Sequence, residues 1–126
     1  MGLDSNFYRV HKEAINTSTD FEVNRDKYNV TDVAYFRKNS ALQGWMQQLY
    51  RSKGGTDLEF NCCNVVVTID DLLILHKQLK ANKVLPTNGF FFGEMDDDKY
   101  ENLKQEVVKM IDDYDPEYVY YYFAWY

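Results

Sequence analysis

The feature that most constrains the fold is the aromatic run at residues 117–126, EYVYYYFAWY, which directly follows Pro116. Proline cannot continue a helix, and Tyr, Phe, Val and Trp are residue types that strands favour. The run therefore predicts a final strand. Residues 58–68 contain three consecutive valines and predict its partner, with pairing around Val65 to Val67. Residues 3–10 have a partly alternating apolar pattern and predict a first strand.

The clearest helical period lies in the middle of the first half of the chain. Its apolar side chains recur at intervals of three and four residues, at Leu42, Trp45, Met46, Leu49 and Tyr50. We expect this helix to begin at Thr31 or Asp32 and to end before Gly54. On a helical wheel extended over this range, Arg37 and Arg51 fall on one face beside the apolar stripe.

Two further helices follow. Thr68-Ile69-Asp70-Asp71 resembles a capping box and predicts a helix over 69–81, and three aspartates at 96–98 precede a predicted helix over 99–113. Residues 11–30 show no sustained period and predict a long loop, with one short strand around Phe21. The predicted fold class is α+β, with a small antiparallel or mixed sheet of three to five strands packed against about three helices.

The length of 126 residues suits one domain and is too short for two, so residues 1–126 predict a single globular domain. No stretch approaches the roughly 18 consecutive apolar residues of a membrane helix, and the N-terminus lacks an apolar secretory core. We expect no membrane partner and a cytoplasmic location. Cys62 and Cys63 are neighbours in sequence and predict two free thiols in a reducing compartment.

Charge is unevenly distributed along the acidic chain, whose formal net charge is −6. Residues 1–55 carry eight Lys or Arg against six Asp or Glu, whereas residues 56–126 carry six against fourteen. Proteins bind duplex nucleic acid chiefly through many Lys and Arg contacts to phosphate. We therefore expect no direct binding of duplex nucleic acid, while a local basic site for a small anion stays open.

Catalytic and metal-binding patterns are weak in this sequence. His11 and His76 are available as bases, but no local pattern ties either to Cys62 or Cys63. Adjacent cysteines lack the two-residue gap that lets both thiolates face one zinc ion. Residues 89–93, GFFFG, place bulky side chains where a phosphate-binding loop needs small ones. We predict a protein that is not an enzyme, with no metal and no cofactor.

Recognition of a ligand is the hypothesis that remains. Four basic side chains could contact phosphate, namely Arg37, Lys38, Arg51 and Lys53. Five aromatic side chains could stack on a base, namely Trp45, Phe90, Phe91, Tyr122 and Trp125. The plainer alternative is that the aromatic residues form the core and the basic residues a solvated helix face.

Four segments resemble a family of small, uncharacterised proteins from tailed bacteriophages and prophages. They are residues 1–4 (MGLD), 35–46 (YFRKNSALQGWM), 85–93 (LPTNGFFFG) and 120–126 (YYYFAWY). The resemblance extends over nearly the whole chain and implies a phage origin and expression in the cytoplasm of a bacterial host. It carries no catalytic residues across. Small non-enzymatic phage proteins often disarm host immunity.

Three functions follow as hypotheses. The first is a counter-defence protein that sequesters a nucleotide-like signalling molecule, which predicts a closed pocket, convergent Arg and Lys, and a homo-oligomer. The second is a protein-binding inhibitor of a bacterial defence system, of the anti-CRISPR or anti-restriction type, acting through the acidic surface of residues 94–117. The third is an accessory phage protein without a ligand.

Overall fold

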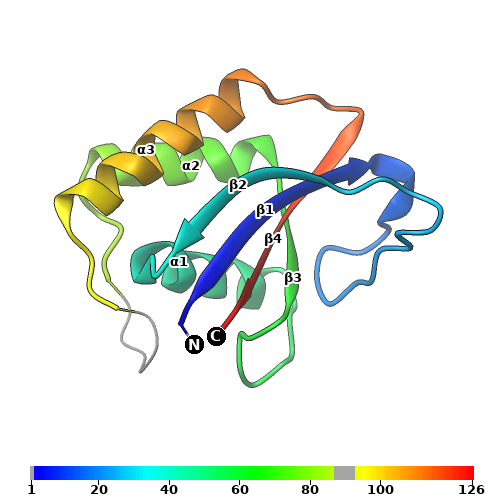
Figure 1. The fold of residues 1–126 in the computed structure, drawn as a ribbon, viewed down its shortest axis with the longest axis horizontal. Helices are drawn as coiled ribbons and strands as arrows, with labels where there is room; N and C mark the ends of the chain where they lie inside the picture. The colour runs from blue at the N-terminus through cyan, green and yellow to red at the C-terminus, as the bar shows by residue number, and fades with distance from the viewer. Residues whose placement is uncertain (1, 87–92) are drawn as a thin grey trace.

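A four-stranded antiparallel sheet forms the centre of the molecule, in a computed structural model that describes residues 2–86 and 93–126. The strands are β1 (Asp4–His11), β2 (Thr31–Arg37), β3 (Asn64–Val67) and β4 (Tyr118–Trp125), in the order β2-β1-β4-β3 (Figure 1). Three helices are also present: α1 (Ser40–Ser52), α2 (Ile69–Lys80) and α3 (Asp97–Asp112). The predicted α+β class is confirmed.

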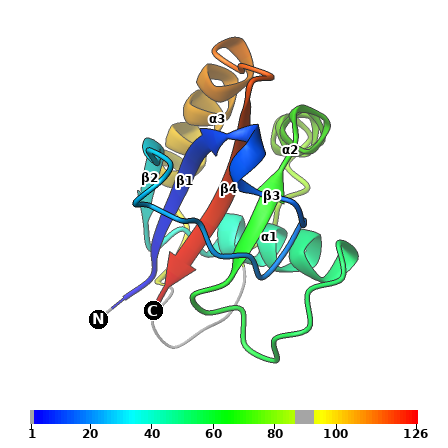
Figure 2. The ribbon, with the colours of Figure 1, turned by 90° about the vertical axis from the view of Figure 1, so that its right-hand side faces the viewer.

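The main core lies between the helices and one face of the sheet. Side chains alternate between the two faces of a strand, so Phe7, Val65 and Tyr122 all point to the helical side, where each is fully buried. Figure 2 shows the strands next to one another, with α1 passing behind β3. The core residues of the helices include Leu42, Met46, Leu72, Leu75, Leu103 and Val107.

The other face of the sheet is only half covered. A short 3-10 helix, η1 (Lys12–Ala14), and the loop that follows it pack Phe21 against Val10 and Tyr121 in a second, smaller cluster. The predicted long loop is therefore confirmed. The strand expected around Phe21 is reduced to an isolated bridge between Thr19 and Val65. The loop packs over the His11 end of β1, whereas near the other end of the sheet the side chains of Tyr35 and Trp125 are exposed.

The predicted start of the first helix is wrong, because residues 31–37 form the edge strand β2. Ala34 and Phe36 are buried while Tyr35 and Arg37 are exposed, which is the alternation of a strand. Lys38 has a φ of 53° and turns the chain, after which the side chain of Asn39 caps α1 by accepting from Leu42 N at 3.0 Å. Arg37 is thus not on a helix, and it shares no helical face with Arg51.

Other boundaries were predicted more closely. The α2 helix begins with the expected capping box, in which Thr68 and Asp71 each accept from the other's backbone N–H. The predicted pairing of the last strand is confirmed by the register of Val65 with Tyr122. The strand expected over 58–68 is shorter, because Cys62 has a φ of 61° that breaks the extended conformation. Ile74 of α2 is apolar but 50% exposed.

Candidate binding surface on the open half of the sheet

Two rows of cross-strand neighbours lie on the face of the sheet opposite the helices. Asp4 is paired with Arg37 on one side and Trp125 on the other, and Asn6 is paired with Tyr35 and Phe123. Because side chains two residues apart on a strand share a face, both rows present their side chains on the same surface. We call it the open face, formed by Asp4, Asn6, Tyr35, Arg37, Phe123 and Trp125.

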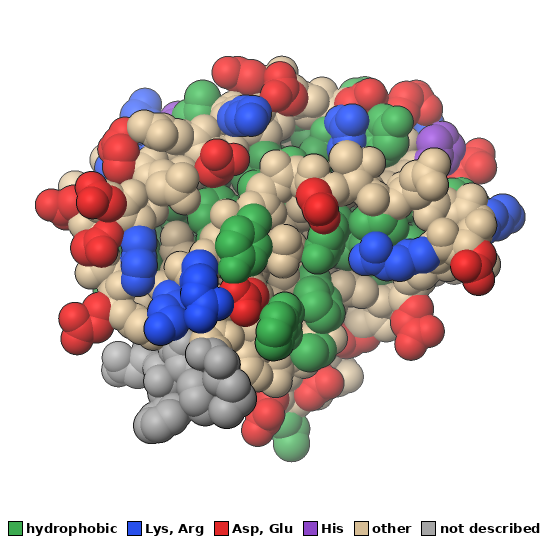
Figure 3. Space-filling model, viewed as in Figure 1, with side chains coloured by type: hydrophobic (Ala, Val, Ile, Leu, Met, Phe, Trp, Pro, Cys, Tyr) green, Lys and Arg blue, Asp and Glu red, His purple; other side chains and the backbone are tan. Residues whose placement is uncertain are grey.

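The open face combines aromatic and charged groups at the surface. The side chains of Tyr35 and Trp125 are 54% and 50% exposed, which is unusual for large aromatic residues. Figure 3 views the molecule from this side and shows hydrophobic side chains near the middle of the face, with a group of Lys and Arg side chains next to them. Such an arrangement offers flat rings for stacking and donors for an anion.

Asp4 fixes the orientation of its two neighbours on β2. Its carboxylate accepts a hydrogen bond from the hydroxyl of Tyr35 and a second from Arg37 Nη1 at 2.9 Å. The bond from Tyr35 is the main cause of a lowered pKa for Asp4, and the pKa of the Tyr35 hydroxyl is raised in turn. A guanidinium has five N–H donors, so Arg37 is held in place with donors left for a ligand.

Lys38 and Lys99 add positive charge at the same corner. A Cβ atom on Gly2 would lie 3.2 Å from both Arg37 Nη2 and Lys38 Cε, so these two side chains lie close together. The ammonium of Lys99 donates to the carbonyl of Lys38 at 3.1 Å. Arg37 is paired with the carboxylate of Asp4, whereas Lys99 lies on α3 directly after Asp96, Asp97 and Asp98, so acidic side chains border these three cations. We call Arg37, Lys38 and Lys99 the basic corner.

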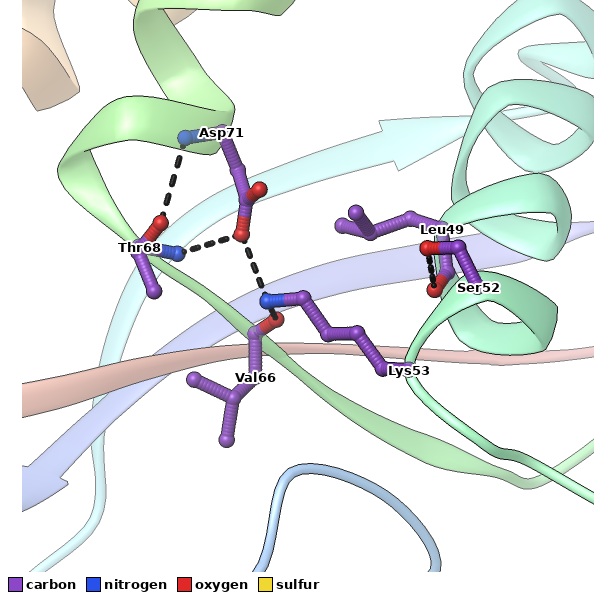
Figure 4. Close-up of polar contacts among 6 residues, drawn as sticks. All are labelled: Leu49, Ser52, Lys53, Val66, Thr68 and Asp71. Carbon is purple, nitrogen blue, oxygen red and sulfur yellow. Dashed lines mark hydrogen bonds and ion pairs between the residues drawn. The ribbon is translucent and has the colours of Figure 1, made fainter.

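The residues predicted to bind at the far end of α1 serve the fold instead. Lys53 Nζ donates at 2.6 Å to the carbonyl of Val66 and at 2.6 Å to Asp71 Oδ2, which ties α1 to β3 and α2 (Figure 4). The guanidinium of Arg51 donates to the carbonyls of Asp57 and Leu58. The 13 residues of α1 rise about 20 Å, so this end lies far from the basic corner.

The remaining predicted aromatic residues are in different environments. Trp45 is half-buried against the core, and its indole N–H donates to Gln78 Oε1 at 2.7 Å. Tyr122 is fully buried, with its hydroxyl 2.7 Å from Gln43 Oε1 and 2.8 Å from Ser5 Oγ, and burial raises its pKa. Phe90 and Phe91 lie outside the described residues. Of the nine predicted residues, the structure brings Arg37, Lys38 and Trp125 to one surface.

The closed pocket expected for a sequestering protein is not found among residues 2–86 and 93–126. One cavity of about 390 Å³ is open to solvent and is lined in part by Asp97, Tyr100, Glu101 and Lys104. Carboxylates at its rim disfavour an anionic ligand. The convergence of basic residues is instead on the open face, which is a surface and not a pocket.

Tyr35, Phe123 and Asp4 were missed by the sequence analysis although a signal for them was present. Residues 34–37 alternate between small or apolar side chains that are buried and the exposed Tyr35 and Arg37. In the aromatic tail, Tyr120, Tyr122 and Ala124 are buried and Trp125 is exposed, while Tyr121 is buried on the opposite face under the loop. A two-residue period therefore separates the two faces of the sheet, and the loop decides which residues of the second face stay exposed.

No protein-family model matches this chain, and the comparisons with curated proteins and with solved structures gave no match. The resemblance to tailed-phage proteins therefore stays a prediction. Within the described ranges, no helix is long and apolar enough to cross a membrane. The same residues hold no group of three or more His, Cys, Asp or Glu side chains that could bind a metal ion.

Proposed function

We propose that this chain is a phage-encoded, non-enzymatic binding protein that holds a nucleotide-like anion on its open face and thereby sequesters a signal of host defence. The observation that carries the proposal is that Arg37, Tyr35 and Trp125 are exposed on the same face of the sheet, with Asp4 between Arg37 and Trp125. The phage origin and the counter-defence role rest on the four segments that resemble phage proteins.

The two parts of the open face suit the two parts of a nucleotide. The guanidinium of Arg37 forms forked hydrogen bonds to phosphate, and the ammonium groups of Lys38 and Lys99 add point charges. Tyr35 and Trp125 offer rings on which a base can stack. Because Asp4 already orients Arg37 and Tyr35, binding orders few side chains, which lowers the entropic cost of association.

Cys63 is poorly suited to act as a catalytic nucleophile. Cys63 is buried, and burial raises the pKa of its thiol. A protonated thiol is a poor nucleophile, since the thiolate is the reactive form.

The first test looks for the ligand itself. Protein purified from phage-infected bacteria is denatured, and the released small molecules are identified by mass spectrometry. In parallel, the melting temperature is measured against a panel of nucleotides. We expect a released nucleotide-like compound and a rise in melting temperature for at least one nucleotide. The absence of both would overturn the proposal.

A matched pair of variants places the site. Arg37→Gln removes the guanidinium of the basic corner, and Arg51→Gln makes the same change at the other end of α1. We expect Arg37→Gln to weaken nucleotide binding about tenfold or more, because charge-assisted hydrogen bonds to phosphate are lost. Arg51→Gln should bind as the wild type does. Equal losses in both variants would place the site elsewhere.

A second candidate function is protein-binding inhibition through α3 and the residues flanking it. Asp97, Asp98, Asp112 and Asp113 are all exposed, so the acidic surface that this hypothesis requires is present. We propose Asp→Asn changes at these four positions as its test, with Asp96 kept because its side chain caps α3 by accepting from Lys99 N. Unchanged anti-defence activity in this variant would exclude the mechanism, and loss of activity with intact nucleotide binding would favour it.

A further inference from the structure

A small cavity continues from the open face toward the covered half of the sheet. Its volume is about 140 Å³, and it is lined by Tyr8, Val23, Arg25, Asn64, Tyr121 and Phe123. Phe123 belongs to the open face as well, so the two areas are continuous. The guanidinium of Arg25 lies 5.7 Å from the centre of the Tyr8 ring, at cation–π distance.

The cavity suits a base better than a phosphate. Asp32 faces Tyr8 across the β1–β2 register and offsets the charge of Arg25, so no net positive charge gathers there. The rings of Tyr8 and Phe123 provide flat apolar walls, and the amide of Asn64 provides polar atoms at the edge. Stacking beneath a guanidinium is a common way in which proteins hold an unpaired base.

The distance between the basic corner and the Arg25 cavity is longer than a single nucleotide. Tyr8 is four residues along β1 from Asp4, and at about 3.4 Å per residue the cavity lies about 14 Å from the basic corner. A mononucleotide has one base, which cannot stack on Trp125 and also fill the cavity beside Arg25. A strand of two nucleotides supplies a phosphate for the basic corner and one base for each area.

We infer that the open face and the Arg25 cavity together bind a short single-stranded oligonucleotide of at least two nucleotides. This inference rests on the proposed function and names its ligand class. Single strands expose the base faces that the rings of Tyr35, Trp125 and Tyr8 can reach, whereas a duplex keeps them stacked inside. A strand of two or three nucleotides contacts the basic corner and the nearly neutral cavity, so it meets the acidic surface of α3 only at the residues beside Lys99.

The test compares three probes by calorimetry at one salt concentration: thymidine 5′-monophosphate, 5′-phosphorylated dithymidylate, and a short hairpin duplex. We expect the dinucleotide to bind about tenfold or more tightly than the mononucleotide, because a second base is stacked. Equal affinities for the two single-stranded probes would overturn the inference and leave the proposed function standing. If neither the mononucleotide nor the dinucleotide binds, both this inference and the proposed function are overturned. A duplex that binds as tightly as the dinucleotide would overturn the single-strand assignment.

Arg25→Gln and Lys27→Gln form the matched pair of variants, since both residues are exposed in the same loop and only Arg25 lines the cavity. In Arg25→Gln, the affinity for the dinucleotide should fall to nearly that for the mononucleotide. The affinity for the mononucleotide should stay unchanged. Lys27→Gln should keep the higher affinity for the dinucleotide. An unchanged difference between the two probes in Arg25→Gln, or an equal loss for both probes, would show that the cavity is not a second base site.

Discussion

The two faces of the sheet use the same residue types for different purposes. On the helical face, Phe7 and Tyr122 are fully buried and their rings meet edge to face with centroids 5.3 Å apart. On the open face, Tyr35 and Trp125 belong to neighbouring rows and are half exposed. An aromatic content of 17% therefore does not measure the size of the core. The face to which a strand turns each ring decides whether it stabilises the fold or stays available for a ligand.

The largest difference between the faces should appear on truncation of an aromatic side chain. Phe7→Ala leaves a cavity among Phe36 and Tyr122, and we expect the free energy of unfolding to fall by about 3–5 kcal/mol. Trp125→Ala removes a half-exposed ring and should cost less than about 1 kcal/mol. Denaturant unfolding of both variants measures the two values. Similar losses would mean that Trp125 is also part of the core.

A smaller difference should follow from removal of a single hydroxyl on each face. Tyr122→Phe leaves the buried Gln43 and Ser5 without their shared partner, which should cost about 1–3 kcal/mol. Tyr35→Phe removes the bond to Asp4 at a site where water can replace it, so the cost should be below about 1 kcal/mol. Thermal or denaturant unfolding of the pair tests the contrast. A larger loss for Tyr35→Phe would contradict it.

The smallest effect concerns pH and the open face alone. The pKa of Asp4 is lowered in the folded state, so its contribution is present above the ordinary carboxyl value of about 3.9 and is lost as the pH falls through the folded value. Wild type should exceed Asp4→Asn in free energy of unfolding by less than about 1 kcal/mol near neutral pH, since Arg37 is half exposed. This gap should close in acid. A gap that persists at a pH where the Asp4 carboxyl is protonated in the folded protein, as followed by NMR titration, would show that charge is not its cause.

The sequence predicted elements better than it predicted the site. The Thr68 capping box, the apolar period of α3 and the valine-rich strand are local patterns, and each forms the expected type of element, although the strand is shorter than predicted. The predicted start of α1 was wrong because the side chains from Val33 to Phe36 suit a strand, and the capping residue of the helix comes only three residues later. Arg37 and Trp125 are 88 positions apart and meet only through pairing with Asp4, which no local pattern encodes. The structural role of Lys53 depends likewise on contacts with β3 and α2.

The strand order has a consequence for how the molecule folds. The two central strands of the sheet, β1 and β4, come from opposite ends of the described chain, and Asp4 is in register with Trp125. The pairing closes a loop of more than one hundred residues, which places the protein among slow-folding topologies of high contact order. During synthesis, β1 and β2 can form a hairpin early, but until β4 leaves the ribosome β3 can pair only with the loop, through the bridge between Thr19 and Val65. The sheet therefore assembles only after translation has passed Trp125, and until then Phe7 and Val65 lack the ring of Tyr122 that covers them.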